Sequence, residues 1–101
     1  MLGPVRSAYD ILGLARGATP EAVRRAYRTL AKTAHPDQAG DTPEAHDAFL
    51  EIRAAYEILA DPLRRAAYDL DPTGLLEHQV DVERRRQRIR RRRMRIMRLY
   101  E

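Results

Sequence analysis

The sequence predicts an all-α fold built around an antiparallel pair of helices. Residues typical of a helix start occur four times in the first seventy positions. Within 23–34 and 45–59, apolar residues recur three and four positions apart, a spacing that gathers them on one face of a helix. No run alternates between apolar and polar residues, as a half-buried strand would.

Each of the four helix starts combines a capping residue with a neighbour that suits the first turn. Ser7 followed by Asp10 has the form of a capping box, in which each side chain accepts a hydrogen bond from the other residue's amide. The later starts pair a capping residue with proline: Thr19-Pro20-Glu21, Thr42-Pro43-Glu44 and Asp61-Pro62. The second and third helices are predicted to be long, and the first and fourth short.

The two long helices carry the predicted core. Their periodic apolar residues are Val23, Ala26, Tyr27, Leu30, Ala31 and Ala34 in the second helix and Ala45, Ala48, Phe49, Ile52, Ala55, Tyr56 and Leu59 in the third. A loop of about eight residues joins these helices, which favours an antiparallel hairpin. The two short flanking helices are expected to cover the ends of this hairpin.

The loop between the long helices opens with His35-Pro36-Asp37. Pro36 disfavours helical backbone at the residue before it, so the second helix is predicted to end at about His35. The proline also stiffens the loop, which limits the entropy lost when a partner binds the two polar side chains. The approaching helix presents basic residues on one solvent-facing side: Arg24, Arg25, Arg28 and Lys32. This arrangement is typical of a docking surface for another protein.

The C-terminal segment differs in charge from the rest of the chain. Residues 1–78 carry nine basic and twelve acidic side chains, a net charge of −3, whereas residues 79–101 carry ten arginines and three acids, a net charge of +7. The arginines of this arm are Arg84, Arg85, Arg86, Arg88, Arg90, Arg91, Arg92, Arg93, Arg95 and Arg98. The predicted organisation is a lead at 1–6, a compact domain at 7–70, a linker at 71–78 and an arginine-rich arm at 79–101.

Composition disfavours several classes of protein. The absence of cysteine excludes disulfides and thiolate sites, and fits a reducing compartment such as the cytoplasm, where we expect the chain to act. No apolar stretch suits a transmembrane helix or a secretory signal. We expect no cofactor and no metal, because the sequence has no glycine-rich phosphate loop and because His35, His46 and His78 lack the spacing of metal ligands. His46 is expected to face solvent.

An enzyme is also disfavoured, and no catalytic residue is expected. The most plausible arrangement for catalysis would use His35 as a general base with Asp37 or Asp41 beside it. The sequence offers no nucleophile or orienting third group for such a site.

Four ordered blocks resemble the J-domain, the module shared by Hsp40 (DnaJ-like) co-chaperones. They are Tyr9-Asp10-Ile11-Leu12-Gly13, Val23-Arg24-Arg25-Ala26-Tyr27 with His35-Pro36-Asp37, Phe49-Leu50-Glu51-Ile52-Arg53-Ala54-Ala55-Tyr56, and Arg64-Arg65-Ala66-Ala67-Tyr68-Asp69. The resemblance runs from about Ser7 to Asp69 and implies a J-domain fold. No Gly/Phe-rich region or Cys-x-x-Cys repeat follows, so the chain resembles a minimal member of the family.

The resemblance implies a co-chaperone that binds an Hsp70 in its ATP state and stimulates ATP hydrolysis by that partner. Carried over to this sequence, the required residues are His35, Pro36 and Asp37. The basic side chains expected to meet an acidic face of the Hsp70 nucleotide-binding domain are Arg24, Arg25, Arg28 and Lys32. Opposite charges on the two surfaces would speed their encounter and fix their register.

The sequence departs from the family around the loop. Thr29, Thr33, Ala34 and Gln38 stand where basic or aromatic residues are common. We expect Hsp70 binding to be retained, and the smaller number of basic residues near the loop leaves weaker affinity or a narrower choice of partner as alternatives.

The arm is predicted to be a basic helix or a tail with a partner of its own. Arg90 to Arg93 repel one another within a helix unless a partner neutralises them. A protein or ribonucleoprotein assembly is the favoured partner, because apolar residues such as Ile89 and Met94 between the arginines could anchor a helix in a groove. Nucleic acid, an anionic membrane surface and a solubilising tail remain alternatives.

A different class of function is a structural subunit that keeps a J-like scaffold and docks its arm in a larger complex or on nucleic acid. This alternative predicts that His35→Gln leaves function intact, whereas the co-chaperone interpretation predicts loss.

Overall fold

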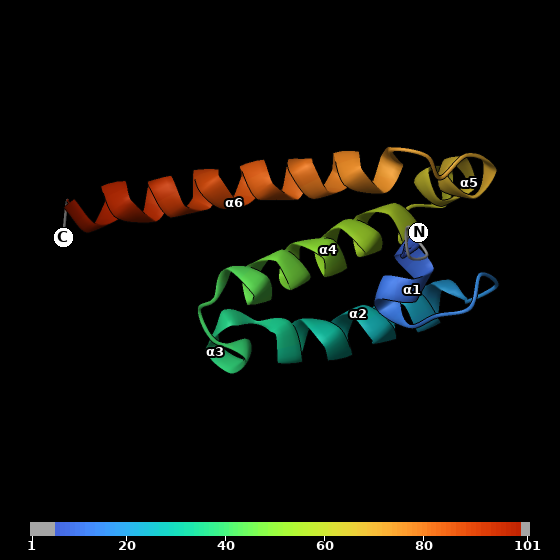
Figure 1. The fold of residues 1–101 in the computed structure, drawn as a ribbon, viewed down its shortest axis with the longest axis horizontal. Coiled ribbons are helices and arrows are strands. Elements are labelled where there is room, and N and C mark those ends of the chain that lie inside the picture. The colour runs from blue at the N-terminus through green and yellow to red at the C-terminus, as the bar shows by residue number, and fades with distance from the viewer. Residues whose placement is uncertain (1–5, 100–101) are drawn as a thin grey trace, which may run out of the picture.

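The structure, a computed structural model, describes residues 6–99 and contains six helices in this range (Figure 1). They are α1 (Ala8–Leu12), α2 (Pro20–Ala34), α3 (Pro36–Ala39), α4 (Pro43–Leu59), α5 (Pro62–Leu70) and α6 (Leu75–Leu99). No strand occurs between residues 6 and 99, which confirms the predicted all-α class. Apart from Arg6, the predicted lead lies outside the described residues.

The predicted helix starts are confirmed by their caps. Ser7 and Asp10 form the full capping box, each side chain accepting the other's amide N–H at 3.0 Å. The side chains of Thr19, Thr42 and Asp61 accept amide N–H groups in the first turns of α2, α4 and α5. Local capping therefore sets where the helices of the compact part begin.

Helices α2 and α4 form the predicted antiparallel hairpin. Val23 in α2 packs in one cluster with Ile52 and Leu59 in α4, and all three side chains are buried. The rings of Tyr27 and Tyr56 stack between the helices with their centroids 4.1 Å apart. The hairpin places His35, at the end of α2, beside Phe49 of α4.

Helix α4 is buried on more sides than the single apolar face that the sequence predicts. Ala48, expected on the core face, is exposed, whereas Leu50, Ala54 and Ile58 are buried although they lie outside that face. The reason is that α4 packs against α6 as well as against α1 and α2. A helix covered on several sides loses the simple one-face pattern on which the prediction depended.

The two short flanking helices are joined by side-chain hydrogen bonds. The guanidinium of Arg65 in α5 donates to the carbonyl oxygens of Arg16 and Ala18 (3.0 and 2.7 Å) and to the hydroxyl of Tyr9 in α1 (3.1 Å). The hydroxyl of Tyr9 in turn donates to Asp69 at 2.7 Å. These bonds fix α5 and the loop before α2 to α1.

A Tyr68→Phe variant is expected to lower the free energy of unfolding by about 1–2 kcal/mol. The hydroxyl of buried Tyr68 accepts the amide N–H of Ala8 at 2.9 Å, and this first-turn amide has no partner within its own helix. Urea denaturation measures the change. Tyr56→Phe is the matched control, because the hydroxyl of Tyr56 makes no hydrogen bond within the described residues. Equal losses in the two variants would contradict the assigned role of the Tyr68 hydroxyl.

The C-terminal arm is a helix, one of the two predicted forms, and its first half belongs to the packed body. Helix α6 begins at Leu75, within the predicted 71–78 linker, directly after Gly74 at a φ of +79° that suits glycine. It runs along α4 on the side away from α2, so α4 lies between them (Figure 1). Its first turns bury Leu76, Gln79 and Glu83. None of the helices described is both long and apolar enough to cross a membrane.

Candidate functional site

The tripeptide His35-Pro36-Asp37 lies at the junction of α2 and α3. Helix α2 ends at Ala34, as predicted, and His35 adopts extended backbone (φ −60°, ψ 141°). The chain then forms the single turn of α3, in which the amides of Gln38 and Ala39 donate to the carbonyl oxygen of His35 (2.8 and 2.9 Å). The sequence pattern did not predict this turn. It makes the tripeptide a fixed corner between two helices.

The imidazole of His35 is held from two sides. Its Nδ1 accepts the amide N–H of Asp37 at 3.2 Å, and its ring meets the ring of Phe49 edge-on with centroids 6.2 Å apart. Nδ1 also lies 3.5 Å from the Asp37 carboxylate, and Nε2 makes no hydrogen bond within the described residues. The side chains of His35 and Asp37 are 54% and 85% exposed. The corner therefore offers a partner the Nε2 of a fixed imidazole beside an exposed carboxylate.

Most of the predicted contact residues share one surface with the tripeptide. Arg25, Arg28 and Lys32 line the same shallow depression as His35 and Asp37. Arg24 does not line this depression and forms an ion pair with Glu21 at 3.4 Å. The side chain of Pro36 lies outside the described part of the structure. A single basic surface thus leads along α2 to the corner.

The ten arginines of the arm fall into two groups. Three of them contact the body: Arg84 pairs with Asp47 at 3.6 Å, Arg86 pairs with Glu57 at 3.7 Å, and Arg91 lies 3.2 Å from a ring nitrogen of His46. The others form no ion pair within residues 6–99, and all are exposed: Arg85, Arg88, Arg90, Arg92, Arg93, Arg95 and Arg98. Only in the second group do the guanidinium groups form neither an ion pair nor a hydrogen bond with another side chain of the described residues.

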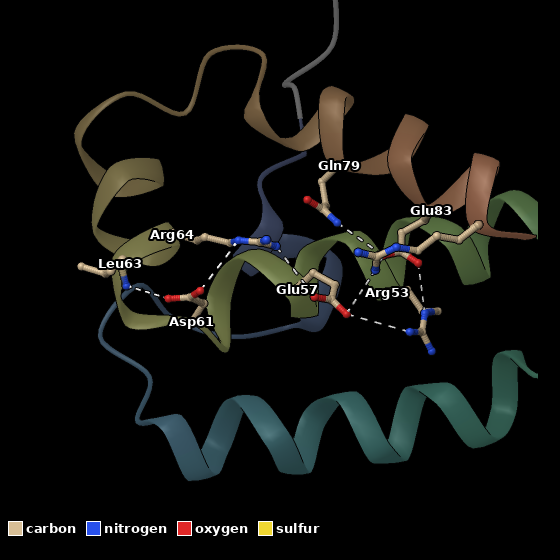
Figure 2. Close-up of polar contacts among 8 residues, drawn as sticks. Arg53, Glu57, Asp61, Leu63, Arg64, Gln79 and Glu83 are labelled. Atoms are coloured by element: carbon tan, nitrogen blue, oxygen red, sulfur yellow. Dashed lines mark hydrogen bonds and ion pairs between the residues drawn. The ribbon is translucent and has the colours of Figure 1, made fainter.

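A buried ionic cluster fastens α6 to α4. Figure 2 shows Arg53 and Gln79 directed at the carboxylate of Glu83, which is 3% exposed. The distances to this carboxylate are 3.2 Å from Arg53 Nε, 2.9 Å from Arg86 Nη1 and 3.3 Å from Gln79 Nε2. Arg53 also donates to the hydroxyl of Tyr27 at 3.2 Å and so links α2, α4 and α6. The sequence pattern did not predict this cluster. The signal for it in the sequence was Glu83, an acidic residue on the same helical face as Leu76.

The prediction that His46 faces solvent is wrong. Its side chain is only 18% exposed, because α6 covers the first turn of α4 and places Arg91 against the ring. On the other side, His46 Nε2 contacts the carboxylate of Asp41. The hydrogen bond from His46, followed by the charge of that ring, holds the pKa of Asp41 below its ordinary value of 3.8.

Replacing His46 with alanine is expected to return the pKa of Asp41 to its ordinary range. In the folded wild-type protein this pKa is depressed, so the contact stabilises the fold above the ordinary value of 3.8 and is lost as the pH falls through the folded-state pKa. NMR titration of the Asp41 carboxyl carbon in both proteins measures the difference. An Asp41 pKa that is the same in the two proteins would show that His46 is not the cause.

Within residues 6–99, no group of three or more histidine and acidic side chains is arranged to hold a metal ion. His35 and His46 both line a cleft beside α6, but the rest of its lining is basic, amide or apolar. The arrangement around the tripeptide presents hydrogen-bonding groups and positive charge.

Comparison with known proteins identifies this architecture. The family model of the DnaJ domain matches residues 7–69. The chaperone protein DnaJ of Carboxydothermus hydrogenoformans is 55% identical over 64 residues, covering 63% of this chain and 17% of that protein. The DnaJ of Halothermothrix orenii is 45% identical over 76 residues, covering 74% of this chain and 20% of that protein. The chain thus spans a fifth or less of the length of these two relatives.

A solved structure agrees with the sequence relatives. The crystal structure of the J-Trx1 fragment of ERdj5 superposes with a TM-score of 0.62 at 37% sequence identity, covering 66% of this chain and 32% of that one. The part of the chain that matches the family model covers α1 to α4 and all of α5 except Leu70, and it ends before α6. On these grounds, the chain belongs to the DnaJ-domain (J-domain) family.

Proposed function

We propose that this protein is a co-chaperone that binds an Hsp70 in its ATP state and stimulates ATP hydrolysis there through His35-Pro36-Asp37. The observation that carries the proposal is the fixed, exposed corner of His35 and Asp37 at the end of the basic surface of α2, in a member of the DnaJ-domain family. The proposed site of action is the cytoplasm.

In the proposed mechanism, the basic side chains attract the Hsp70 and the fixed corner makes the specific contacts. Arg25, Arg28 and Lys32 attract an acidic surface of the Hsp70 and set the register of the complex. The corner then binds with little loss of entropy, because α3 and Phe49 already hold His35 in place. The groups that hydrolyse ATP belong to the Hsp70, and this chain regulates them.

Single-turnover ATP hydrolysis by Hsp70s from the source cell tests the proposal. With the full chain added, the hydrolysis rate is expected to rise above that of the Hsp70 alone and to saturate with concentration. If no cognate Hsp70 responds, the alternative of a structural subunit built on a J-like scaffold is favoured instead.

We further propose that α6 targets the protein to a protein or ribonucleoprotein assembly. Support comes from its exposed arginines, among them Arg85 and Arg92, and from exposed apolar side chains such as Ile89 and Ile96 beside them. Arg85→Glu with Arg92→Glu is expected to release the protein from the assembly in co-sedimentation from cell extract. Binding to naked RNA or to anionic vesicles that falls steeply with salt would favour the other two targets.

A further inference from the structure

Helix α6 extends beyond the helix on which it packs. The contacts run antiparallel: Glu83 meets Arg53 in the middle of α4, and Arg91 meets His46 in its first turn. From Arg91 to Leu99, α6 continues for about 12 Å at the helical rise, past the N-terminal end of α4. Figure 1 shows this end of α6 projecting beyond α4 at the same end of the molecule as α3.

The inward face of α6 changes character where the support of α4 ends. Over α4 this face is apolar and acidic, with Leu76, Val80 and Glu83. Further along, the same helical face carries Arg91, Met94, Arg95 and Arg98, which form one wall of a cleft. The opposite wall is formed by His35, His46 and Phe49.

His35 is the residue shared by two basic surfaces. On one side it lines the depression that runs along α2 with Arg25, Arg28 and Lys32. On the other side it lines the cleft whose far wall is the end of α6. No carboxylate lines this cleft among the described residues, and its apolar contribution comes from Phe49 and Met94. The cleft therefore suits an acidic segment that also carries an apolar side chain.

We infer that the end of α6 is a second wall of the Hsp70-binding surface, and that the cleft between α6 and His35 takes an acidic, partly apolar segment of the same Hsp70. This inference rests on the proposed function and adds the residues Arg95, Arg98 and Met94 to its site. The wall is preorganised, because Glu83, Arg84 and Arg91 hold α6 on α4 before any partner arrives. It also supplies basic side chains near a corner flanked by Thr33 and Ala34 in α2 and by Gln38 in α3.

The test measures the Kd of the full chain for the ATP-bound Hsp70 together with stimulation of hydrolysis below saturation. Arg95→Glu and Arg98→Glu are each expected to weaken binding about fivefold, since an acidic segment would face a reversed charge. Met94→Ala, which leaves the charge unchanged, is expected to weaken it about twofold. Arg16→Glu is the charge-matched control: Arg16 is exposed and precedes α2, at the end of that helix far from His35. It is expected to bind like the wild type.

The outcomes separate this inference from the function on which it rests. If the wild-type protein stimulates Hsp70 but the Arg95, Arg98 and Met94 variants bind as tightly as Arg16→Glu, the cleft is not part of the surface. Tighter binding by Arg95→Glu would also overturn the inference, because it would mean that α6 obstructs the site. If the wild-type protein neither binds nor stimulates any cognate Hsp70, the proposed function fails, and the inference fails with it.

Discussion

Replacing His35 with glutamine is expected to reduce the stimulated rate of ATP hydrolysis to that of the Hsp70 alone. Glutamine is polar and uncharged, but it lacks the ring that contacts Phe49 and the Nδ1 acceptor that receives the amide of Asp37. The polar group at position 35 would then no longer be held at a fixed position beside the Asp37 carboxylate. A flexible side chain at the corner would lose the preorganisation on which tight, oriented binding depends. Single-turnover hydrolysis measures the effect directly.

His78→Gln provides the control for this experiment. His78 is exposed in the first turns of α6, so the variant makes the same chemical change away from the corner. It is expected to stimulate like the wild type. Circular dichroism and thermal melting of both variants show whether the fold is intact. Stimulation retained by a folded His35→Gln protein would contradict the co-chaperone proposal and would support the scaffold alternative.

The compact part of the fold was predictable because its signals are local. Ser7, Thr19, Thr42 and Asp61 cap their helices through amides two or three residues away, so a short window of sequence contains both partners. The end of α2 follows from the backbone restriction that Pro36 places on His35. The corner and the basic face of α2 could be located for the same reason.

The packing of α6 could not be predicted in this way. Its anchor joins Arg53 to Glu83, thirty residues apart, and nothing near either residue indicates the other. The arginine content of the arm pointed to repulsion within a helix, whereas in the structure Arg84 and Arg91 reach Asp47 and His46 on α4. Contacts of this kind depend on which helices meet, so they become visible only in the folded protein.

The packing also changes how the arm should be tested. A chain ending at Gly74 would remove Leu76, which belongs to the buried core cluster, and Val80, which packs against it. Such a truncation would uncover α4 as well as remove the arginines. Point variants on α6 separate the two effects.

The Glu83→Ala variant is expected to lower the free energy of unfolding by about 2 kcal/mol. Removal of this carboxylate leaves the guanidinium of Arg53, which is 25% exposed, without its partner at 3.2 Å, and it leaves the amide of buried Gln79 without an acceptor. A fully buried charge would cost more, but water reaches part of Arg53 and limits the penalty. Urea denaturation measures the loss. Glu77→Ala, at an exposed acid on the same helix, is expected to cost about 0.5 kcal/mol or less.

A double variant tests whether the paired charges of Arg53 and Glu83 are needed for the contact between α4 and α6. Arg53→Met combined with Glu83→Leu removes both charges and leaves apolar side chains of similar size between α4 and α6. The part of the loss that comes from leaving Arg53 without this carboxylate is expected to return, whereas the part that comes from Gln79 is not. If the double variant stays as unstable as Glu83→Ala, the cluster stabilises the fold through its specific hydrogen bonds, including the one from Arg53 to the hydroxyl of Tyr27. Equal stability of Glu83→Ala and Glu77→Ala would instead show that α6 is not fastened at Glu83. Because this anchor also holds the far end of α6 beside His35, Glu83→Ala is expected to weaken Hsp70 binding without touching the corner itself.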